Sequence, residues 1–295
     1  MAVLLATSCV KPAPRESVEK SPNVAPSIHK TKATPIVTVP KVTANTAKEE
    51  HRPSVPPIEI KVDPKLPKVS IIIDDVGLRR DALDVFWAIN SLRKRLTWAI
   101  IPGTPHGSSL AKELHAQGET ILFHIPMEPM DAKWMTASLE PYLLVSDDAD
   151  KIRTKLTQRL AQLPADITKD IKGLSNHQGS RFSTNSKAMS TLMSTLKKHE
   201  LFYVDSRTTA DTVAESLAIQ NKVPFARRHV FLDNVPEVPV IMVQLKELTQ
   251  RALKTGAAIA IGHPYPQTAS ALAIWIQENR NILQVVPVQH LVSTP

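Results

Sequence analysis

Two adjacent carboxylates at the end of an apolar run are the first sign of chemistry in this chain of 295 residues. They are Asp74 and Asp75, which follow the run 69–73 (VSIII) and precede Gly77. Buried charge is costly unless it is paired or binds a metal. Two acids at the end of a strand can divide the work, one binding a metal and the other moving protons. The alternative is an ordinary turn after a strand, since Asp and Gly both favour turns.

Four further apolar runs are each followed by residues that can act as acids, bases or metal ligands. In chain order these residues are His124 and Glu128, His177 and Arg181, Asp205, and His263. A single histidine after a strand is usually structural, whereas five strand ends with such groups together indicate one site. One Asp and two imidazoles are typical of a catalytic zinc site that leaves a position open for water. A second carboxylate could accept the proton of that water, and a histidine on another loop could protonate the leaving group.

The elements that would position these residues alternate along the chain from residue 69 onward. Strand-like runs occupy 69–73, 96–101, 120–125, 171–174, 201–204, 257–261 and 283–288, with a weaker run at 223–226. Helix-like segments lie between them at 81–92, 108–117, 147–163, 186–199, 209–220, 238–254 and 268–278. This alternation predicts an α/β fold with a parallel sheet, and the number of units favours a barrel over an open sheet. In a parallel barrel, chemistry lies at the carboxyl ends of the strands, where all five motifs fall.

The five motifs resemble those of the divergent polysaccharide deacetylases, distant relatives of the NodB-type carbohydrate deacetylases. The motifs are 73–77 (IDDVG), 123–129 (FHIPMEP), 176–182 (NHQGSRF), 204–208 (VDSRT) and 261–264 (IGHP), and the resemblance covers nearly all of residues 69–290. It implies a distorted (β/α) barrel of about seven parallel strands. It also implies a divalent metal, usually taken as zinc, and the removal of acetyl groups from a polysaccharide.

The resemblance assigns the metal ligands and the base. Asp74 matches the catalytic base, Asp75 the metal-binding aspartate, and His124 the first metal-binding histidine. Enzymes of the NodB type have a second histidine four residues later, where this chain has Glu128. The third ligand is therefore either Glu128 or His177. We favour His177, because imidazole suits the site and a nearby glycine allows close approach.

Three further residues receive roles beside the metal. Arg181 resembles the arginine that orients the base, and His263 resembles the histidine that acts as the acid. Asp205 would orient His263. Glu128 has a structural alternative as the ion-pair partner of Arg181 or Arg207, since structural ion pairs also gather at such sites.

The first 67 residues differ in composition from the rest. Residues 10–67 hold 11 of the 24 prolines and none of the 8 glycines, which predicts a disordered, Pro-rich linker before a barrel domain at 68–295. Residues 1–9 resemble the end of a bacterial lipoprotein signal, with Cys9 as the site of a lipid anchor, but lack a basic start and most of the apolar region. A true remnant predicts a periplasmic protein of the cell envelope, and a coincidental one a cytoplasmic protein.

Composition excludes other classes of protein. Cys9 is the only cysteine, so neither an intrachain disulfide nor a zinc–thiolate cluster can form. The net charge of +8 lies largely in the first 68 residues, and no stretch interleaves basic and aromatic residues, so we expect no nucleic-acid partner. No later stretch is long and apolar enough to span a bilayer.

The leading hypothesis is a metal-dependent hydrolase that removes acetyl groups from an envelope polysaccharide or a peptidoglycan-like glycan. The alternative is a non-catalytic, glycan-binding or scaffold protein of the envelope with a vestigial metal site, which Glu128 and the long tail would suit. A metal phosphoesterase is a third hypothesis, but it would need a richer ligand set. All three share one fold, so the fold alone does not choose between them.

Overall fold

The structure is a computed structural model that describes residues 62–80 and 83–295. The expectations for the lipoprotein signal, Cys9 and most of the linker fall outside these residues. Residues 62–67 belong to the folded part, because the side chain of Gln284 bonds to the N–H of Asp63 (2.9 Å) and the carbonyl of Leu66 (2.9 Å). None of the helices among the described residues combines the length and the apolar character needed to cross a membrane.

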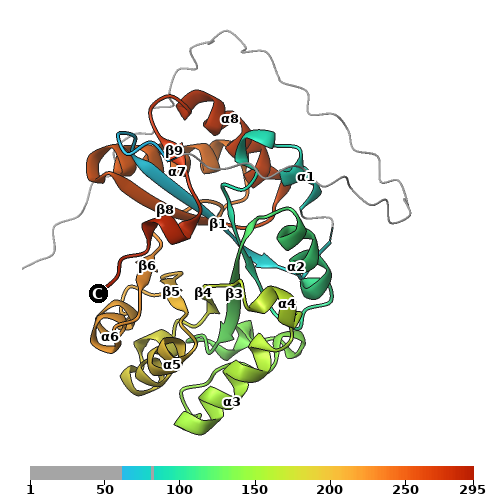
Figure 1. The fold of residues 1–295 in the computed structure, drawn as a ribbon, viewed down its shortest axis with the longest axis vertical. Helices are drawn as coiled ribbons and strands as arrows, with labels where there is room; N and C mark the ends of the chain where they lie inside the picture. The colour runs from blue at the N-terminus through green and yellow to red at the C-terminus, as the bar shows by residue number, and fades with distance from the viewer. Residues whose placement is uncertain (1–61, 81–82) are drawn as a thin grey trace, which may run out of the picture. The chain divides into compact units, whose positions relative to one another are not determined.

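The strands form one parallel sheet that curls into a half-barrel (Figure 1). The spatial order is β6-β5-β4-β3-β2-β1-β8-β7, and β9 pairs with the start of β1. The strands are β1 (Lys68–Val76), β2 (Thr97–Ile100), β3 (Thr120–Met127), β4 (Gly173–Gln178), β5 (Phe202–Asp205), β6 (Phe225–Arg227), β7 (Val230–Phe231), β8 (Ala257–Gly262) and β9 (Gln284–Val285). The predicted α/β, barrel-like fold with parallel strands is confirmed.

Helices follow most of the strands, though not β6, and cover the outer side of the sheet (Figure 1). They are α1 (Asp84–Trp87), α2 (Gly107–Ala116), α3 (Ala149–Leu160), α4 (Ala165–Thr168), α5 (Ser186–Lys198), α6 (Ala214–Asn221), α7 (Val238–Thr255) and α8 (Pro266–Asn279). Asn185 caps α5 by accepting a hydrogen bond from the N–H of Ala188 (2.9 Å), whereas α3 is capped by Asp148. The short 3-10 helix η5 (Val288–Leu291) follows β9, and the segment after it pairs with β6 through Ser293.

The alternation of side chains along the strands builds two apolar cores. On β1, Val69, Ile71 and Ile73 pack against the helices, whereas Ile72 points to the inside of the half-barrel. The inner core is made by residues from six strands and η5: Ile72, Ala99, Leu122, Phe202, Val204, Ala226, Ile259, Ile261 and Val288. Because the side-chain period of a strand is two residues, the position after Ile72 that faces inward is Asp74, and the one after Leu122 is His124. The inner core thus forms the floor beneath these two polar residues.

His229, the residue before the short strand β7, helps to hold this strand against β8. The Nδ1 atom of His229 accepts a hydrogen bond from the N–H of Ile259 on β8 (3.0 Å), which it can do only while Nδ1 carries no proton. Burial is the main cause that lowers the pKa of His229 from 6.5 to about 4, and three nearby arginines lower it further. The stability that this histidine contributes is therefore fully present above pH 6.5 and is lost as the pH falls toward 4.

We expect His229→Gln to weaken the pH dependence of stability. The wild-type free energy of unfolding should fall more steeply than that of the variant between about pH 7 and about pH 5, because only the wild type must keep this imidazole neutral. Urea unfolding at several pH values measures both curves, and all other titrating groups are shared. Parallel curves would show that His229 does not carry this effect.

Candidate functional site

A bulge in β1 brings Asp74 and Asp75 to the same cavity. Ile73 pairs with Trp98 and Val76 with Ile100, so two residues of β1 stand opposite one residue of β2. Asp75 has a φ of 60°, in the left-handed region that few non-glycine residues adopt. A regular strand would point adjacent side chains to opposite faces. The bulge removes that constraint, and both carboxylates line the cavity.

Asp75 lies against the two histidines predicted to share a metal with it. Its Oδ1 atom is 3.2 Å from Nε2 of His124 and 2.7 Å from Nδ1 of His177. One donor atom from each of the three residues lies within 4.8 Å of the other two. Donors around a tetrahedral zinc ion are spaced by about 3.3 Å, given bond lengths of about 2.0–2.1 Å. The 2.7 Å contact is a hydrogen bond in this structure, and the three residues offer donor atoms of suitable chemistry within reach of one small divalent cation.

The surroundings of the cluster also fit a metal site. Ser175 Oγ lies 2.7 Å from Nδ1 of His124, which leaves Nε2 to face Asp75 and orients the ring as outer partners of metal ligands do. On His177 it is Nδ1 that faces Asp75, and its buried Nε2 has no hydrogen-bond partner among the described residues, so only His124 has such an outer partner. Burial opposes the charge of Asp75, but His177 and His124 outweigh it and hold the pKa of this carboxyl well below its usual value. Asp75 is thus kept as the carboxylate that a metal needs.

Asp74 lies beside this cluster and is buried. The residue is 4% exposed, and its Oδ1 atom is buried without a hydrogen-bond partner in the part of the chain described. Its Oδ2 atom lies 3.4 Å from Ser206 Oγ and 3.6 Å from Nε2 of His124. Burial raises the pKa of Asp74 despite nearby histidines that act in the opposite direction. The two adjacent aspartates therefore differ. Asp75 contacts both histidines, whereas Asp74 keeps one oxygen, Oδ1, without a partner among the described residues.

His263 stands on the other side of Asp75 and is held by Asp233. Nδ1 of His263 lies 2.9 Å from Oδ1 of Asp233, and the other oxygen of Asp233 accepts hydrogen bonds from the N–H of His263 and from Thr268 (both 2.6 Å). Nε2 of His263 is directed toward Asp75, 3.7 Å from its Oδ2. Burial opposes a charge on His263, but the Asp233 hydrogen bond and the neighbouring carboxylates raise its pKa to about 9.

The orienting role expected for Asp205 falls to Asp233 instead. Asp205, at the end of β5, accepts a hydrogen bond from the N–H of Arg207 (2.7 Å) and so shapes the loop after its own strand. Asp233 follows the apolar residues 230–232, so it obeys the same strand-end pattern as the residues that were predicted. The pattern was missed there because β7 has only two residues.

Glu128 and Arg181 pair with each other away from the metal cluster. Oε1 of Glu128 is 3.1 Å from Nη1 of Arg181, and Oε2 accepts a hydrogen bond from the N–H of Val145 (2.6 Å). The Arg181 side chain is 54% exposed. In the structure Glu128 is therefore the ion-pair partner of Arg181, and it fixes the loop after β3. The structure does not bring Arg181 to Asp74, the base that Arg181 was expected to orient.

Asn176 ties the ends of β4 and β5 together. Its Oδ1 atom accepts hydrogen bonds from the Tyr203 hydroxyl and the N–H of Ser206 (both 2.9 Å), and its Nδ2 donates to the carbonyl of Gln178 (2.7 Å). Gly179 comes next with a φ of 86°, and a Cβ there would lie 2.9 Å from Cβ of Met127. Sequence patterns did not single out Asn176 or Ser206, because amides and hydroxyls are frequent in any loop.

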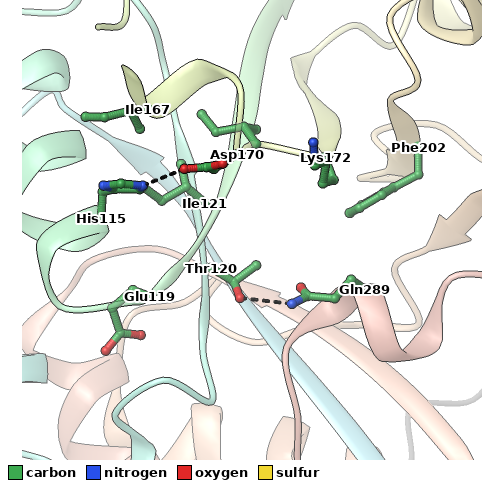
Figure 2. Close-up of a pocket in the computed structure, with 10 residues that line it drawn as sticks. His115, Glu119, Thr120, Ile121, Ile167, Asp170, Lys172, Phe202 and Gln289 are labelled. Carbon is green, nitrogen blue, oxygen red and sulfur yellow. Dashed lines mark hydrogen bonds and ion pairs between the residues drawn. The ribbon is translucent and has the colours of Figure 1, made fainter. Parts of the chain in front are cut away.

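The cavity at these strand ends has a volume of about 400 Å³. A second cavity of about 180 Å³ lies at the opposite, amino ends of β3, β4 and β5 (Figure 2). It contains a single histidine–carboxylate pair, His115 with Asp170 (3.0 Å), whose side chains are 41% and 56% exposed. Only the cavity at the carboxyl ends combines a three-donor cluster with buried acids and a held histidine, as far as the described residues go.

We predict that Zn²⁺ stabilises the wild-type protein and that Asp75→Asn abolishes most of this effect. At about 100 times its Kd a ligand adds about 2.7 kcal/mol, which corresponds to a rise in Tm of about 5–10 °C for a domain of this size. Asn tolerates the left-handed backbone of position 75, so the metal-free variant should melt near the metal-free wild type. Thermal unfolding with and without Zn²⁺ measures both, with the exposed Asp166→Asn as control. An unchanged Zn²⁺ response in Asp75→Asn would remove this residue from the ligand set.

Comparison with known proteins places this site in a family. An uncharacterized protein of Haemophilus influenzae (strain ATCC 51907 / DSM 11121 / KW20 / Rd) is 34% identical over 227 residues, which are 76% of each chain. The uncharacterized protein YibQ of Escherichia coli (strain K12) is 28% identical over 228 residues, 77% of this chain and 68% of YibQ. The crystal structure of the uncharacterized protein ATU2773 from Agrobacterium tumefaciens C58 shares the fold with a TM-score of 0.70. It is 22% identical, and the match covers 77% of this chain and 89% of that one.

The sequence profile of the divergent polysaccharide deacetylases matches residues 71–292, from the first strand to the last 3-10 helix. This span includes all five strand-end motifs and every residue of the site described above. The chain belongs to the divergent polysaccharide deacetylase family.

Proposed function

We propose that this protein is a metal-dependent hydrolase that removes acetyl groups from a glycan of the bacterial cell envelope. The observation that carries the proposal is the convergence of three kinds of group in one cavity. Asp75, His124 and His177 offer metal donors, Asp74 offers an unused buried oxygen, and His263 offers a held imidazole. Family membership supports the same class of reaction.

Asp75, His124 and His177 would hold the metal, which we propose to be zinc because one carboxylate and two imidazoles suit it. When bound, the metal would supply Lewis-acid polarisation of the acetyl carbonyl and of the attacking water. Ser175 supports this role by fixing the ring of His124 through Nδ1. Glu128, engaged with Arg181 and Val145, is left out of the ligand set.

Asp74 would act as the general base. Its Oδ1 atom is free to accept a proton from the attacking water, while Oδ2 is kept in place by Ser206. Water then adds to the acetyl carbon, and the bond from that carbon to the sugar nitrogen or oxygen breaks. The products are acetate and a free amine or hydroxyl group on the glycan.

His263 would act as the general acid. Because Asp233 holds Nδ1, the proton that His263 can transfer is on Nε2, which is directed toward Asp75 in the cavity. Transfer of this proton to the leaving nitrogen or oxygen completes the exchange. Asp233 acts through His263 and is a positioning residue.

The envelope location is part of the proposal and rests on the sequence before the barrel. Residues 1–9 resemble the end of a lipoprotein signal, and residues 10–61 have the proline-rich composition of a stiff spacer. A lipid anchor at Cys9 would then hold the domain near the envelope glycans of the periplasm.

The alternative, a non-catalytic glycan-binding or scaffold protein with a vestigial site, rests on Glu128 in place of a histidine and on the long tail. His177 supplies the imidazole that Glu128 lacks, through Nδ1 at 2.7 Å from Asp75. With base, acid and three donors present together, the catalytic proposal is the better supported of the two.

We expect Asp74→Asn and His263→Gln each to lower kcat for acetate release by about 10²- to 10⁴-fold, the usual contribution of a general acid or base. Acetate release from N- and O-acetylated envelope glycans by Zn²⁺-loaded protein measures the effect. Asp166→Asn and His290→Gln are matched controls at exposed positions and should keep wild-type rates.

The proposal fails if metal-loaded wild type releases no acetate from any of these glycans yet still binds them, since that result fits the non-catalytic alternative. The roles of Asp74 and His263 fail separately if either variant retains wild-type kcat.

A further inference from the structure

Two arginines of the cavity have no part in the mechanism above. Arg207 and Arg228 line the same cavity as Asp74, Asp75 and His263. Arg207 follows β5 and Arg228 follows β6, so both come from the carboxyl ends of strands, where substrates bind in this architecture. Neither the metal cluster nor the acid and base accounts for them.

Arg228 is fixed in position. Its Nε donates to the carbonyl of Ser206 (2.6 Å) and its Nη2 to the carbonyl of Arg207 (2.7 Å), while the guanidinium lies 4.9 Å from the centre of the Phe231 ring. Its Nη1 makes no hydrogen bond to any described residue. A guanidinium held in this way is ready to donate without further loss of side-chain freedom.

Arg207 is held by its backbone, and its side chain is left free. Its N–H donates to Asp205 and its carbonyl accepts from Arg228, which stabilises a left-handed backbone with a φ of 49°. Such a conformation is unfavourable for a long side chain and is found mostly where the surroundings enforce it, as at functional sites. The guanidinium of Arg207 has no hydrogen-bond or ion-pair partner among residues 62–80 and 83–295, although the residue is only partly exposed.

The two guanidinium groups line one cavity and carry like charges. Burial lowers the pKa of Arg228, Asp74 and Asp205 act against this, and Arg207 adds to the lowering by repulsion. An anionic group between two like charges removes that repulsion and accepts hydrogen bonds from both planar forks.

We propose that Arg207 and Arg228 form a subsite for an anionic oxygen group of the substrate, a carboxylate or a phosphate on the acetylated sugar or its neighbour. This inference rests on the proposed deacetylase function and adds that the glycan is acidic near the acetyl group. The free guanidinium of Arg207 would supply one set of donors. Arg228 holds the loop through Nε and Nη2 and would supply a second donor, Nη1.

Binding, rather than turnover, tests the subsite. Isothermal titration calorimetry with Zn²⁺-loaded Asp74→Asn protein would compare three N-acetylated oligosaccharides, one with a carboxylate, the methyl ester of the same compound, and one with a phosphate. We expect the preferred acid to bind about tenfold more tightly than the neutral ester. Adding Arg207→Gln should reduce this preference to about twofold or less, whereas Arg280→Gln, an exposed arginine at the end of α8, should leave it unchanged.

The carboxylate and phosphate arms tell the two sources of anionic oxygen apart. Equal binding of all three compounds, or a preference that survives Arg207→Gln, would overturn the inference while leaving acetate release by the wild type untouched. A preference that Arg207→Gln removes, in a protein that releases no acetate, would keep the subsite and reject only the proposed reaction.

Discussion

The site depends on a single departure from regular strand geometry, the bulge at Asp74 and Asp75. In an ideal strand one of these carboxylates would point among the helices, where no partner could repay its desolvation. The bulge and the left-handed backbone of Asp75 turn it toward His124 and His177, while Asp74 keeps the inward position that the alternation of β1 gives it. The bulge also places two identical side chains in different environments, since Asp75 contacts two histidines and Asp74 keeps one oxygen without a partner among the described residues.

The rest of the half-barrel holds polar groups above an apolar floor. Ile72, Leu122 and Ile261 close the inside of the barrel directly beneath the site. Above them each ring or amide has its own fixing partner: Ser175 for His124, Asp233 for His263, and the Tyr203 hydroxyl for Asn176. Groups held in this way need little reorganisation when charge develops during a reaction. Such preorganisation is the main source of electrostatic catalysis in enzymes.

Much of this arrangement follows from the sequence, because strands and their ends have simple signatures. Apolar runs and the amphipathic segments between them predict the parallel barrel, and the strand-end rule finds Asp75, His124, His177 and His263. The sequence does not show which loops lie close together in space. Asp205 and Asp233 both follow apolar residues, and only the fold shows that Asp233 reaches His263. Glu128 and Arg181 likewise carry the residue types of a site, yet they pair with each other, and β7 is too short for any periodic pattern.

We propose that Asp75, His124 and His177 bind one divalent metal and that Glu128 does not. X-ray absorption at the zinc edge of the purified, Zn²⁺-loaded protein, with metal content measured on the same sample, tests it most directly. We expect one zinc per chain with two imidazoles and oxygen donors at about 2.0–2.2 Å. We also expect that His177→Ala removes one imidazole, whereas Glu128→Gln leaves the spectrum unchanged. A single imidazole in the wild type, or a spectrum altered by Glu128→Gln but not by His177→Ala, would contradict the proposal.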